Sequence, residues 1–258
     1  MKNSTCVILI PIYKEKINFD EYKSIHNTIN LYNNVYDVYF MCNDKLNTSL
    51  YKTLFDIDYK IFSSDLFYDS QSYSDLLINK DFYKGFLNYE YMLIAQHDAY
   101  IFNKISLEYF INKKYNYLGA LCDYIYNIDA SEIIKNNILY NAYYNNYTVK
   151  DLRNVILKKY NISDIGDIGT RLYMSGGLSL RKIDLTYYLL KKEQFWFWAE
   201  DVKICHLLDK YNLLDNILVK DIIKFSVEND KFFNFYKKNN ISVYSVHGLC
   251  PSFYYHMY

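Results

Sequence analysis

A short run of apolar residues, Tyr91–Ala95, constrains the fold more than any other stretch of the chain. Continuous apolar runs of this length are typical of strands that are buried on both faces of a mostly parallel sheet. The polar residues Gln96, His97 and Asp98 follow directly. We therefore expect the Asp98 carboxylate at the carboxyl end of a central strand or just beyond it, where open α/β sheets bind ligands. The alternative is an Asp that caps a turn, which this stretch alone favours because such turns are common.

Segments with strand and helix patterns alternate along the chain. Apolar runs at Val7–Ile10, Val35–Cys42 and Tyr59–Phe62 predict strands, and Asp20–Tyr32 has apolar residues at helical spacing. The later segments predict helices at Ser72–Phe86, Leu107–Ile111, Ile183–Lys191 and Glu200–Tyr211, and strands at Tyr117–Cys122 and Val243–Val246. Such alternation predicts an α/β fold with a mixed, mostly parallel sheet flanked by helices.

Residues 123–172 differ from the rest of the chain. They are polar, rich in Asn and Tyr, and helical in pattern at Ala130–Tyr144 and Val149–Tyr160. We interpret them as a helical insertion in one domain that covers residues 1–258. A lid or acceptor-binding subdomain and a purely structural helical pair are both compatible with this pattern.

Charge and cysteine usage exclude several classes of protein. Lys+Arg and Asp+Glu both count 29, which gives a net charge of zero without a basic stripe. This balance argues against a nucleic-acid partner and against strong electrostatic attachment to anionic lipid. The five cysteines are far apart and form no Cys-x-x-Cys pair, as expected for reduced thiols. No apolar stretch approaches the roughly 20 residues of a membrane span, and no signal peptide is evident. We expect a cytoplasmic protein, with loose association to the inner face of the membrane as an option.

Three further patterns carry candidate chemistry. Gly176-Gly177 lies between apolar residues, Glu200-Asp201 opens a predicted helix, and His247 precedes a glycine at the end of a predicted strand. Each pattern also has an ordinary structural interpretation: a tight turn for the glycines, compensation of the helix dipole for the acids, and a satisfied core residue for the histidine. Taken singly, these structural interpretations are the more common ones.

The order of the patterns is more specific than any one of them, and it resembles a family. The matching pieces are Ile10-Pro11-Ile12-Tyr13-Lys14-Glu15, Asp81-Phe82-Tyr83, Gln96-His97-Asp98-Ala99, Ser175-Gly176-Gly177-Leu178-Ser179-Leu180-Arg181, Glu200-Asp201-Val202 and Val246-His247-Gly248. Together they are similar to a largely uncharacterised bacterial family of glycosyltransferase-like proteins with the GT-A fold. The resemblance runs from about Val7 to Leu249 and is weakest in residues 123–172.

The resemblance implies a sugar-nucleotide site at the ends of the first strands. By position in the matching pieces, one set of residues would meet the base and ribose or lie near the nucleotide. This set consists of Pro11, Ile12, Tyr13, Glu15, Asn43, Tyr73 and Leu77. The basic residues that are candidates for binding the diphosphate of the sugar nucleotide are Lys14, Lys80 and Arg181.

The resemblance also implies a divalent metal, Mn²⁺ or Mg²⁺, held by Asp98 and His247. Hard cations suit carboxylate and phosphate oxygens, and Mn²⁺ also accepts an imidazole. The family motif Asp-x-Asp has two carboxylates, whereas His97-Asp98-Ala99 has one. We therefore expect phosphate oxygens and water to complete the coordination.

For the reaction itself, the resemblance implies a base and a meeting point of two substrates. Gly176 and Gly177 would lie where the donor sugar and the acceptor meet, and Asp201 or its neighbour Glu200 would be the catalytic base. A positioned carboxylate is needed because the attacking hydroxyl must lose its proton. Trp196 and Trp198 either offer a flat apolar face to a sugar or belong to the core, and we weigh the two equally.

These expectations together describe a glycosyltransferase. It would transfer a sugar, with inversion, from a UDP-sugar to a glycan or glycolipid acceptor of a bacterial surface polysaccharide such as a capsule. One rival is a nucleotidyltransferase, which usually carries a Gly-rich basic loop after its first strand; here Pro11-Ile12-Tyr13 contains no glycine. Another rival is a non-catalytic sugar-binding or assembly protein.

The aromatic tail Pro251–Tyr258 either covers a sheet edge or forms a homo-oligomer contact.

Overall fold

The computed structural model describes residues 5–126, 128–162, 172–193, 199–228 and 230–248. In the first part of the chain the elements are β1 Cys6–Pro11, α1 Phe19–Tyr32, β2 Asp37–Asn43, α2 Ser49–Leu54, β3 Asp58–Phe62, the 3₁₀ helix η1 Ser64–Leu66, α3 Ser70–Leu77, α4 Lys80–Lys84, β4 Tyr91–Ala95, β5 Ala99–Ile101, α5 Leu107–Asn112, β6 Tyr117–Leu118 and β7 Leu121–Ile125. The later elements are β8 Ile128–Asp129, α6 Ala130–Lys135, α7 Ile138–Tyr144, α8 Val149–Tyr160, β9 Leu172–Met174, β10 Leu178–Lys182, α9 Ile183–Lys192, α10 Glu200–Lys210, α11 Val219–Phe225, β11 Ser226–Val227, α12 Asp230–Lys238 and β12 Ser245–His247.

The largest sheet of the described residues has six strands in the order β3-β2-β1-β4-β10-β6. The strands β3, β2, β1 and β4 run parallel, and β10 pairs antiparallel with both β4 and β6. Every residue of β1 and β4 is buried, as their continuous apolar sequences predict. The mixed, mostly parallel α/β class expected from the sequence is therefore confirmed.

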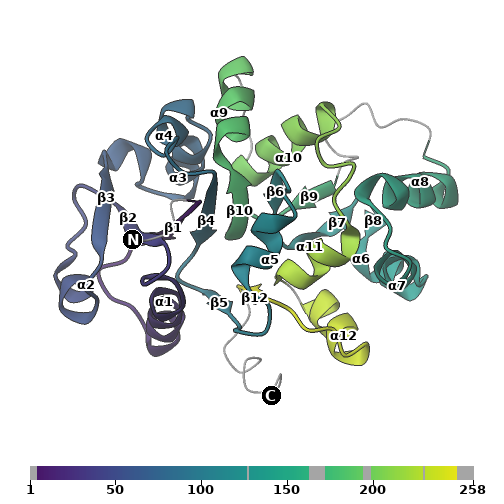
Figure 1. Cartoon of the computed structure of the whole chain (residues 1–258), viewed down its shortest axis with the longest axis horizontal. Helices are drawn as coiled ribbons and strands as arrows, with labels where there is room; N and C mark the ends of the chain where they lie inside the picture. Colours follow the sequence, from purple (N-terminus) through teal and green to yellow (C-terminus); the bar gives the residue numbers. More distant parts are fainter. Residues whose placement is uncertain (1–4, 127, 163–171, 194–198, 229, 249–258) are drawn as a thin grey trace.

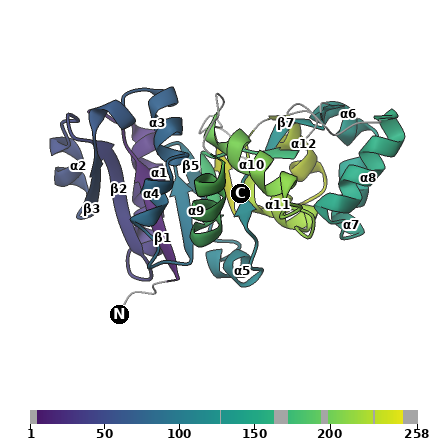
Figure 2. The ribbon, with the colours of Figure 1, turned by 90° about the horizontal axis from the view of Figure 1, so that it is seen from above.

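Helices cover the sheet on different sides. α4 contacts α9 and α9 contacts α10, and the three helices follow one another along the top of Figure 1 and face the viewer in Figure 2. α1 contacts β2 and β5 elsewhere on the molecule. α6, α7 and α8 lie at the end of the molecule opposite to β3 (Figure 1). In the described part of the chain, no helix combines the length and the apolar character needed to cross a bilayer.

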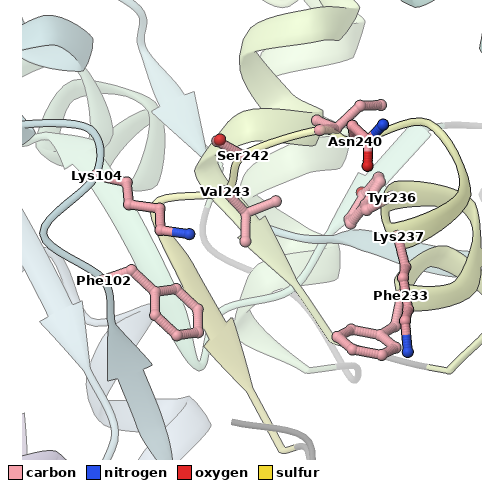
Figure 3. Close-up of a pocket in the computed structure, with 9 residues that line it drawn as sticks. Phe102, Lys104, Phe233, Tyr236, Lys237, Asn240, Ser242 and Val243 are labelled. Atoms are coloured by element: carbon pink, nitrogen blue, oxygen red, sulfur yellow. The ribbon is translucent and has the colours of Figure 1, made fainter. Parts of the chain in front are cut away.

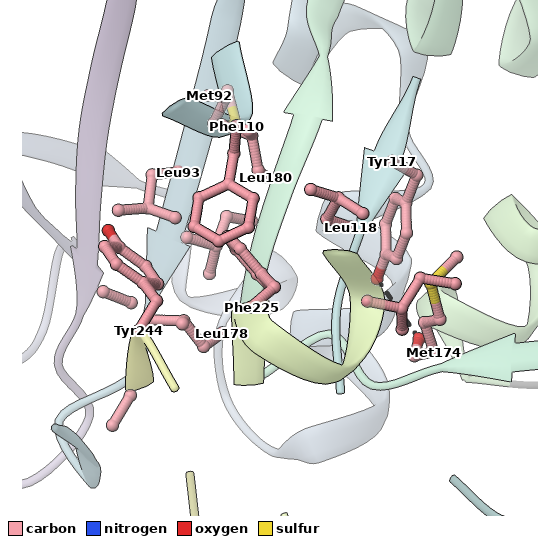
Figure 4. Close-up of a cluster of buried hydrophobic side chains, with 14 of the residues drawn as sticks. Met92, Leu93, Phe110, Tyr117, Leu118, Met174, Leu178, Leu180, Phe225 and Tyr244 are labelled. Atoms are coloured by element: carbon pink, nitrogen blue, oxygen red, sulfur yellow. Dashed lines mark hydrogen bonds between the residues drawn. The ribbon is translucent and has the colours of Figure 1, made fainter. Parts of the chain in front are cut away.

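The core continues from the central sheet into the second half of the chain. Figure 4 shows Met92 and Leu93 of β4 beside Leu180 of β10, with aromatic rings packed nearby. The Phe110 ring lies edge-on to Phe225 at 5.1 Å, and such pairs add to the stabilisation that burial gives. This packing fixes β10 against β4, and so fixes the loop that precedes β10.

Three predicted elements are interrupted in the structure. The helix predicted at Ser72–Phe86 is two helices, because the Asn79 side chain accepts from the Asp81 amide and caps α4 as a new helix. The helix predicted at Ala130–Tyr144 is broken at Asn137, which has a left-handed φ of 58°. The strand predicted at Tyr117–Cys122 is split between two sheets around Gly119. A Cβ atom on Gly119 would lie 2.2 Å from the Ser175 carbonyl oxygen, so the chain turns there against the loop before β10.

Candidate functional site

Three segments meet at the carboxyl end of β4. The strand ends at Ala95 and Gln96–Asp98 form the turn that follows, so Asp98 lies just beyond the central strand, as predicted. The amide of Gln96 donates to the Gly177 carbonyl at 2.9 Å, which brings the loop before β10 to this turn. β12 pairs antiparallel with β5 and places His247 opposite Ala99. Sheet pairing therefore gathers the Asp98, glycine-pair and His247 patterns in one place.

The His247 ring links the predicted metal residues. Its Nε2 lies 3.4 Å from Asp98 Oδ1 and 3.1 Å from Gln96 Oε1. Its Nδ1 lies 3.2 Å from Glu228 Oε1. A Cβ atom on Gly177 would lie 2.0 Å from His247 Cε1, so this ring accounts for the glycine at position 177. His247 and Asp98 are thus brought together as the resemblance implied.

The charges of this pair follow from its contacts. Burial raises the pKa of Asp98, but hydrogen bonding and attraction to His247 outweigh burial and lower this pKa to about 2. Burial lowers the pKa of His247, but hydrogen bonds to Asp98 and Glu228 outweigh burial and raise it to about 9. At neutral pH the protein without a metal therefore holds an imidazolium between two carboxylates.

The donor atoms around His247 can supply only part of the coordination shell of a divalent cation. Among the residues that the structure describes, no group of three or more His, Cys, Asp or Glu side chains could hold a metal ion. The converging donors are the Asp98 carboxylate, the His247 Nε2 and the amide oxygen of Gln96. A cation bound here would displace the proton on Nε2, because a metal-ligating imidazole must be free of it. Phosphate oxygens and water would have to supply the remaining ligands.

A second carboxylate lies at the start of α10. Asp201 Oδ2 accepts from the Gly176 amide at 3.0 Å, and Oδ1 accepts from the Val202 amide at 2.7 Å. Burial and the negative charge of Glu200 raise the pKa of Asp201 to about 6, although these two hydrogen bonds act in the opposite direction. A carboxylate with such a pKa is a suitable general base near neutral pH.

Glu200 has a different environment from its neighbour. It is buried, its Oε1 lies 3.1 Å from Arg181, and its Oε2 accepts from Ser74 Oγ at 3.3 Å. A Cβ atom on Gly176 would lie 2.2 Å from the same Oε1, so Glu200 accounts for the glycine at position 176. Glu200 therefore connects α10 to β10 and α3, and Asp201 is the less buried of the two acids.

Arg181 belongs to the core and not to the ligand surface. Its side chain is 0% exposed and donates to the Tyr83 hydroxyl at 3.0 Å and to Ser179 Oγ at 2.9 Å, in addition to its ion pair with Glu200. A diphosphate cannot reach it. The second basic residue considered for that role, Lys14, pairs with Glu21 at 2.7 Å, and the third, Lys80, opens α4.

A cavity of about 350 Å³ lies beside Gln96. Its lining residues are Pro11, Tyr13, Phe67, Tyr68, Asp69, Ser70, Tyr73 and Gln96. A more open recess of about 770 Å³ shares three of them and is lined by Tyr13, Glu15, Asn43, Lys45, Leu46, Ser64, Asp65, Tyr68, Asp69 and Ser72. Tyr13 and Tyr68 are 51% and 82% exposed, which leaves two aromatic side chains that a planar base can contact.

These cavities include most of the predicted nucleotide residues. Pro11, Tyr13 and Tyr73 line the smaller cavity, and Glu15 and Asn43 line the recess. Ile12 and Leu77 are 1% and 0% exposed and line neither of them, so they support the site from the core. The prediction that they lie near the nucleotide therefore does not include direct contact of their side chains with it.

His97, the middle residue of the turn, faces the first strand. Its Nε2 lies 3.2 Å from the Tyr13 hydroxyl and 3.2 Å from Glu21 Oε1. Burial lowers the pKa of His97, although the charges of Asp98 and Glu21 oppose this effect. His97 thus connects the cavity wall at Tyr13 to the turn that carries Asp98.

Several residues of the site were not predicted from the sequence. Tyr68 and Asp69 lie between η1 and α3, Gln96 stands in the predictions only as part of a motif, and Glu228 follows the short strand β11. Gln96 and Glu228 each come directly after a strand, and Tyr68 and Asp69 lie in the connection that follows β3. These positions are the signal that the sequence offers for them. Trp196 and Trp198, predicted as a sugar-binding face or as core, lie outside the described residues.

A separate cavity of about 290 Å³ lies between the segment after β5 and α12. Figure 3 shows Phe102 and Lys104 on one side of it and Phe233 and Tyr236 on the other. It shares no lining residue with the two cavities described above. We therefore do not assign it to the nucleotide site.

Three solved structures that are similar to this chain are a xylosyltransferase, a mannosyltransferase and a mannan synthase. Mouse xyloside xylosyltransferase 1 in its apo form matches with a TM-score of 0.51 and 10% identity, over 94% of this chain and 97% of that one. The mannosyltransferase Ktr4p from S. cerevisiae matches with a TM-score of 0.44 and 15% identity, over 83% of this chain, and this chain spans 62% of its length. Core-mannan synthase A from Aspergillus fumigatus in its Mn/GDP form matches with a TM-score of 0.42 and 12% identity, over 86% and 69% of the two chains.

The match to the mouse enzyme concerns the fold, and a family model adds the family. The match to the mouse enzyme confirms the GT-A-like fold that was expected from the sequence. The model of a family described as "Protein of unknown function (DUF5672)" matches residues 56–243. No curated protein matches the chain.

Proposed function

The chain belongs to the DUF5672 family, and we propose that it is a glycosyltransferase that moves a sugar from a nucleotide-sugar donor to a hydroxyl group. One observation carries this proposal: three features needed for the reaction lie around one sheet edge. They are a partly aromatic cavity, the Asp98–His247 pair and a carboxylate, Asp201, whose pKa is raised to about 6. Gln96 joins the first two, because it lines the cavity and contacts His247.

The cavity and the recess would hold the nucleotide. Tyr13 and Tyr68 would contact the base through their exposed rings, and Asn43 and Glu15 would face the ribose from the recess. We propose a UDP-sugar as the donor and include GDP-sugars in the test, because aromatic walls contact any base. The acceptor would be a glycan or glycolipid of a bacterial surface polysaccharide, such as a capsule.

The diphosphate would depend on a cation. Arg181 is buried in the core and Lys14 is paired with Glu21, which leaves Lys45 as the basic residue lining the recess. Asp98 and His247 would hold a Mn²⁺ or Mg²⁺ ion together with the phosphates. When bound, such a cation supplies charge stabilisation to the leaving diphosphate.

Asp201 would be the base. In its ionised form it would take the proton of the acceptor hydroxyl as that hydroxyl attacks the anomeric carbon. Its two backbone hydrogen bonds, from Gly176 and Val202, fix the direction of the carboxylate. Direct displacement by one activated hydroxyl inverts the anomeric centre, so we propose an inverting transferase.

The raised pKa of Asp201 predicts the pH dependence of the reaction. Because the base acts only when ionised, the rate should be constant above a pH of about 7 and should fall below a pH of about 6, by roughly tenfold for each further pH unit. Nucleotide release from the donor, measured under saturating donor and Mn²⁺ between pH 4.5 and 8, tests this. A rate that stays constant down to pH 4.5 would contradict the assignment.

Binding of the leaving nucleotide tests the site as a whole. We expect UDP or GDP with Mn²⁺ to raise the melting temperature of the wild type, because a ligand at about 100 times its Kd adds about 2.7 kcal/mol to the free energy of unfolding. Asp98→Asn should lose the part of this gain that requires Mn²⁺. Asp58→Asn, which alters an exposed Asp on the edge strand β3, is the matched control and should keep the gain. If no nucleoside diphosphate shifts the wild type, the proposed function is wrong.

A further inference from the structure

We propose that Glu228 is a positioning residue that holds the His247 ring so that its Nε2 faces Asp98 and Gln96. This inference rests on the proposed function, because it concerns the residues that would hold the cation. It adds a residue that the family resemblance did not supply.

Strand register places Glu228 beside His247. β11 and β12 run parallel, with Ser226 opposite Ser245 and Val227 opposite Val246. The next residue along each strand is Glu228 and His247, respectively. The resulting distance between His247 Nδ1 and Glu228 Oε1 is 3.2 Å. The contact therefore follows from backbone pairing in addition to side-chain attraction.

The carboxylate of Glu228 is itself held in place. Ser175 Oγ donates to Glu228 Oε1 at 2.9 Å, so the loop before β10 and the end of β12 share this oxygen. Gly177, in the same loop, lies against the His247 ring and leaves no room for a Cβ atom. The ring is thus confined by Gly177 and bound at Nδ1, and its side chain is only 12% exposed.

Imidazole chemistry explains what this contact does. When a cation takes the place of the proton on Nε2, the carboxylate at Nδ1 would keep the remaining proton on Nδ1, and Nε2 would be the nitrogen that faces the cation. Nε2 is the atom within 3.4 Å of Asp98 Oδ1 and 3.1 Å of Gln96 Oε1. Glu228 contacts the opposite nitrogen of the ring, so its role is to orient the ligand and not to replace it.

Mn²⁺ affinity tests the inference directly. Free Mn²⁺ is measured by electron paramagnetic resonance during titration of the protein, with UDP and, in parallel, with GDP. We expect Glu228→Gln to raise the Kd for Mn²⁺ about 10- to 100-fold, which is usual when an outer partner of a metal ligand is lost. Glu228→Asp keeps the charge and should lose less. Glu132→Gln, the same substitution at an exposed position on α6, should leave the Kd unchanged.

A second measurement separates positioning from damage to the fold. Nucleotide affinity without Mn²⁺ should be equal in wild type and Glu228→Gln, because the nucleotide cavity does not include Glu228. If Glu228→Gln does not fold, the inference is tested with Glu228→Asp alone. A roughly threefold or larger rise in its Kd for Mn²⁺ would support the role of Glu228.

The outcomes also distinguish this inference from the proposed function. If the wild type binds Mn²⁺ with either nucleotide and the Glu228 variants have an unchanged Kd for Mn²⁺, only the role of Glu228 is overturned. Wild type that binds no Mn²⁺ with either nucleotide overturns both the role of Glu228 and the cation-dependent part of the proposed function.

Discussion

Replacing Asp201 with Asn is expected to lower the turnover of the nucleotide sugar by about 10²- to 10⁴-fold, the usual contribution of a general base. The amide has nearly the shape of the carboxylate, and its oxygen can still accept from the Gly176 or the Val202 amide. It cannot take a proton from the acceptor hydroxyl. The melting-temperature gain with nucleotide and Mn²⁺ should therefore remain, while release of nucleotide from the donor almost stops.

Asp184→Asn is the matched control for this experiment. Asp184 is also an acid in the first turn of a helix, α9, and its Oδ1 also accepts from the next backbone amide. If first-turn acids matter here only through the helix dipole, the two substitutions should have similar small effects. Turnover within tenfold of wild type in Asp201→Asn would show that Asp201 is such a residue and would remove it from the proposed mechanism.

The sequence located Asp98 because the relevant information is local. A polar residue directly after a fully apolar run marks the end of a buried strand, and β4 ends at Ala95 as its sequence indicates. The pair Glu200-Asp201 was also apparent locally, at the start of a predicted helix, whereas its role as the base came from the family resemblance. What the sequence could not show is which of Glu200 and Asp201 is buried against Arg181, because that depends on how α10 packs on β10.

Glu228 and Tyr68 show where sequence reasoning ends. The contact of Glu228 with His247 depends on the register of β11 and β12, two short strands that are 19 residues apart at the paired positions Ser226 and Ser245. Tyr68 is one of 32 tyrosines, and only the path of the chain after β3 leaves its ring exposed beside the cavity. Apolar patterns also continue across Asn79 and Gly119, where capping and close backbone approach interrupt the elements.

Replacing Arg181 with Met is expected to lower the free energy of unfolding by about 3–5 kcal/mol, because it leaves the buried Glu200 carboxylate without its cation. The Arg181 side chain is 0% exposed and that of Glu200 is 8% exposed, so water cannot replace the lost partner. Tyr83 and Ser179 lose a donor as well. Urea denaturation at neutral pH measures the change.

Lys210→Met is the control for this substitution. It breaks the pair with Glu193, whose two side chains are 45% and 35% exposed, and exposed pairs contribute at most about 1 kcal/mol. Equal losses of the free energy of unfolding in Arg181→Met and Lys210→Met would show that the buried pair stabilises the fold no more than an exposed surface pair does.

The double variant Arg181→Met, Glu200→Met separates stability from positioning. Apolar residues of similar size often replace a buried ion pair without loss, so the double variant should regain most of the stability that Arg181→Met loses. Glu200 is adjacent to Asp201 and lies against Gly176, whose amide binds the Asp201 carboxylate. If the double variant is stable but slow in turnover, the ion pair serves to hold Asp201 in place. If it is stable and fully active, the pair is a feature of the core, and the two hydrogen bonds from Gly176 and Val202 are enough to position the base.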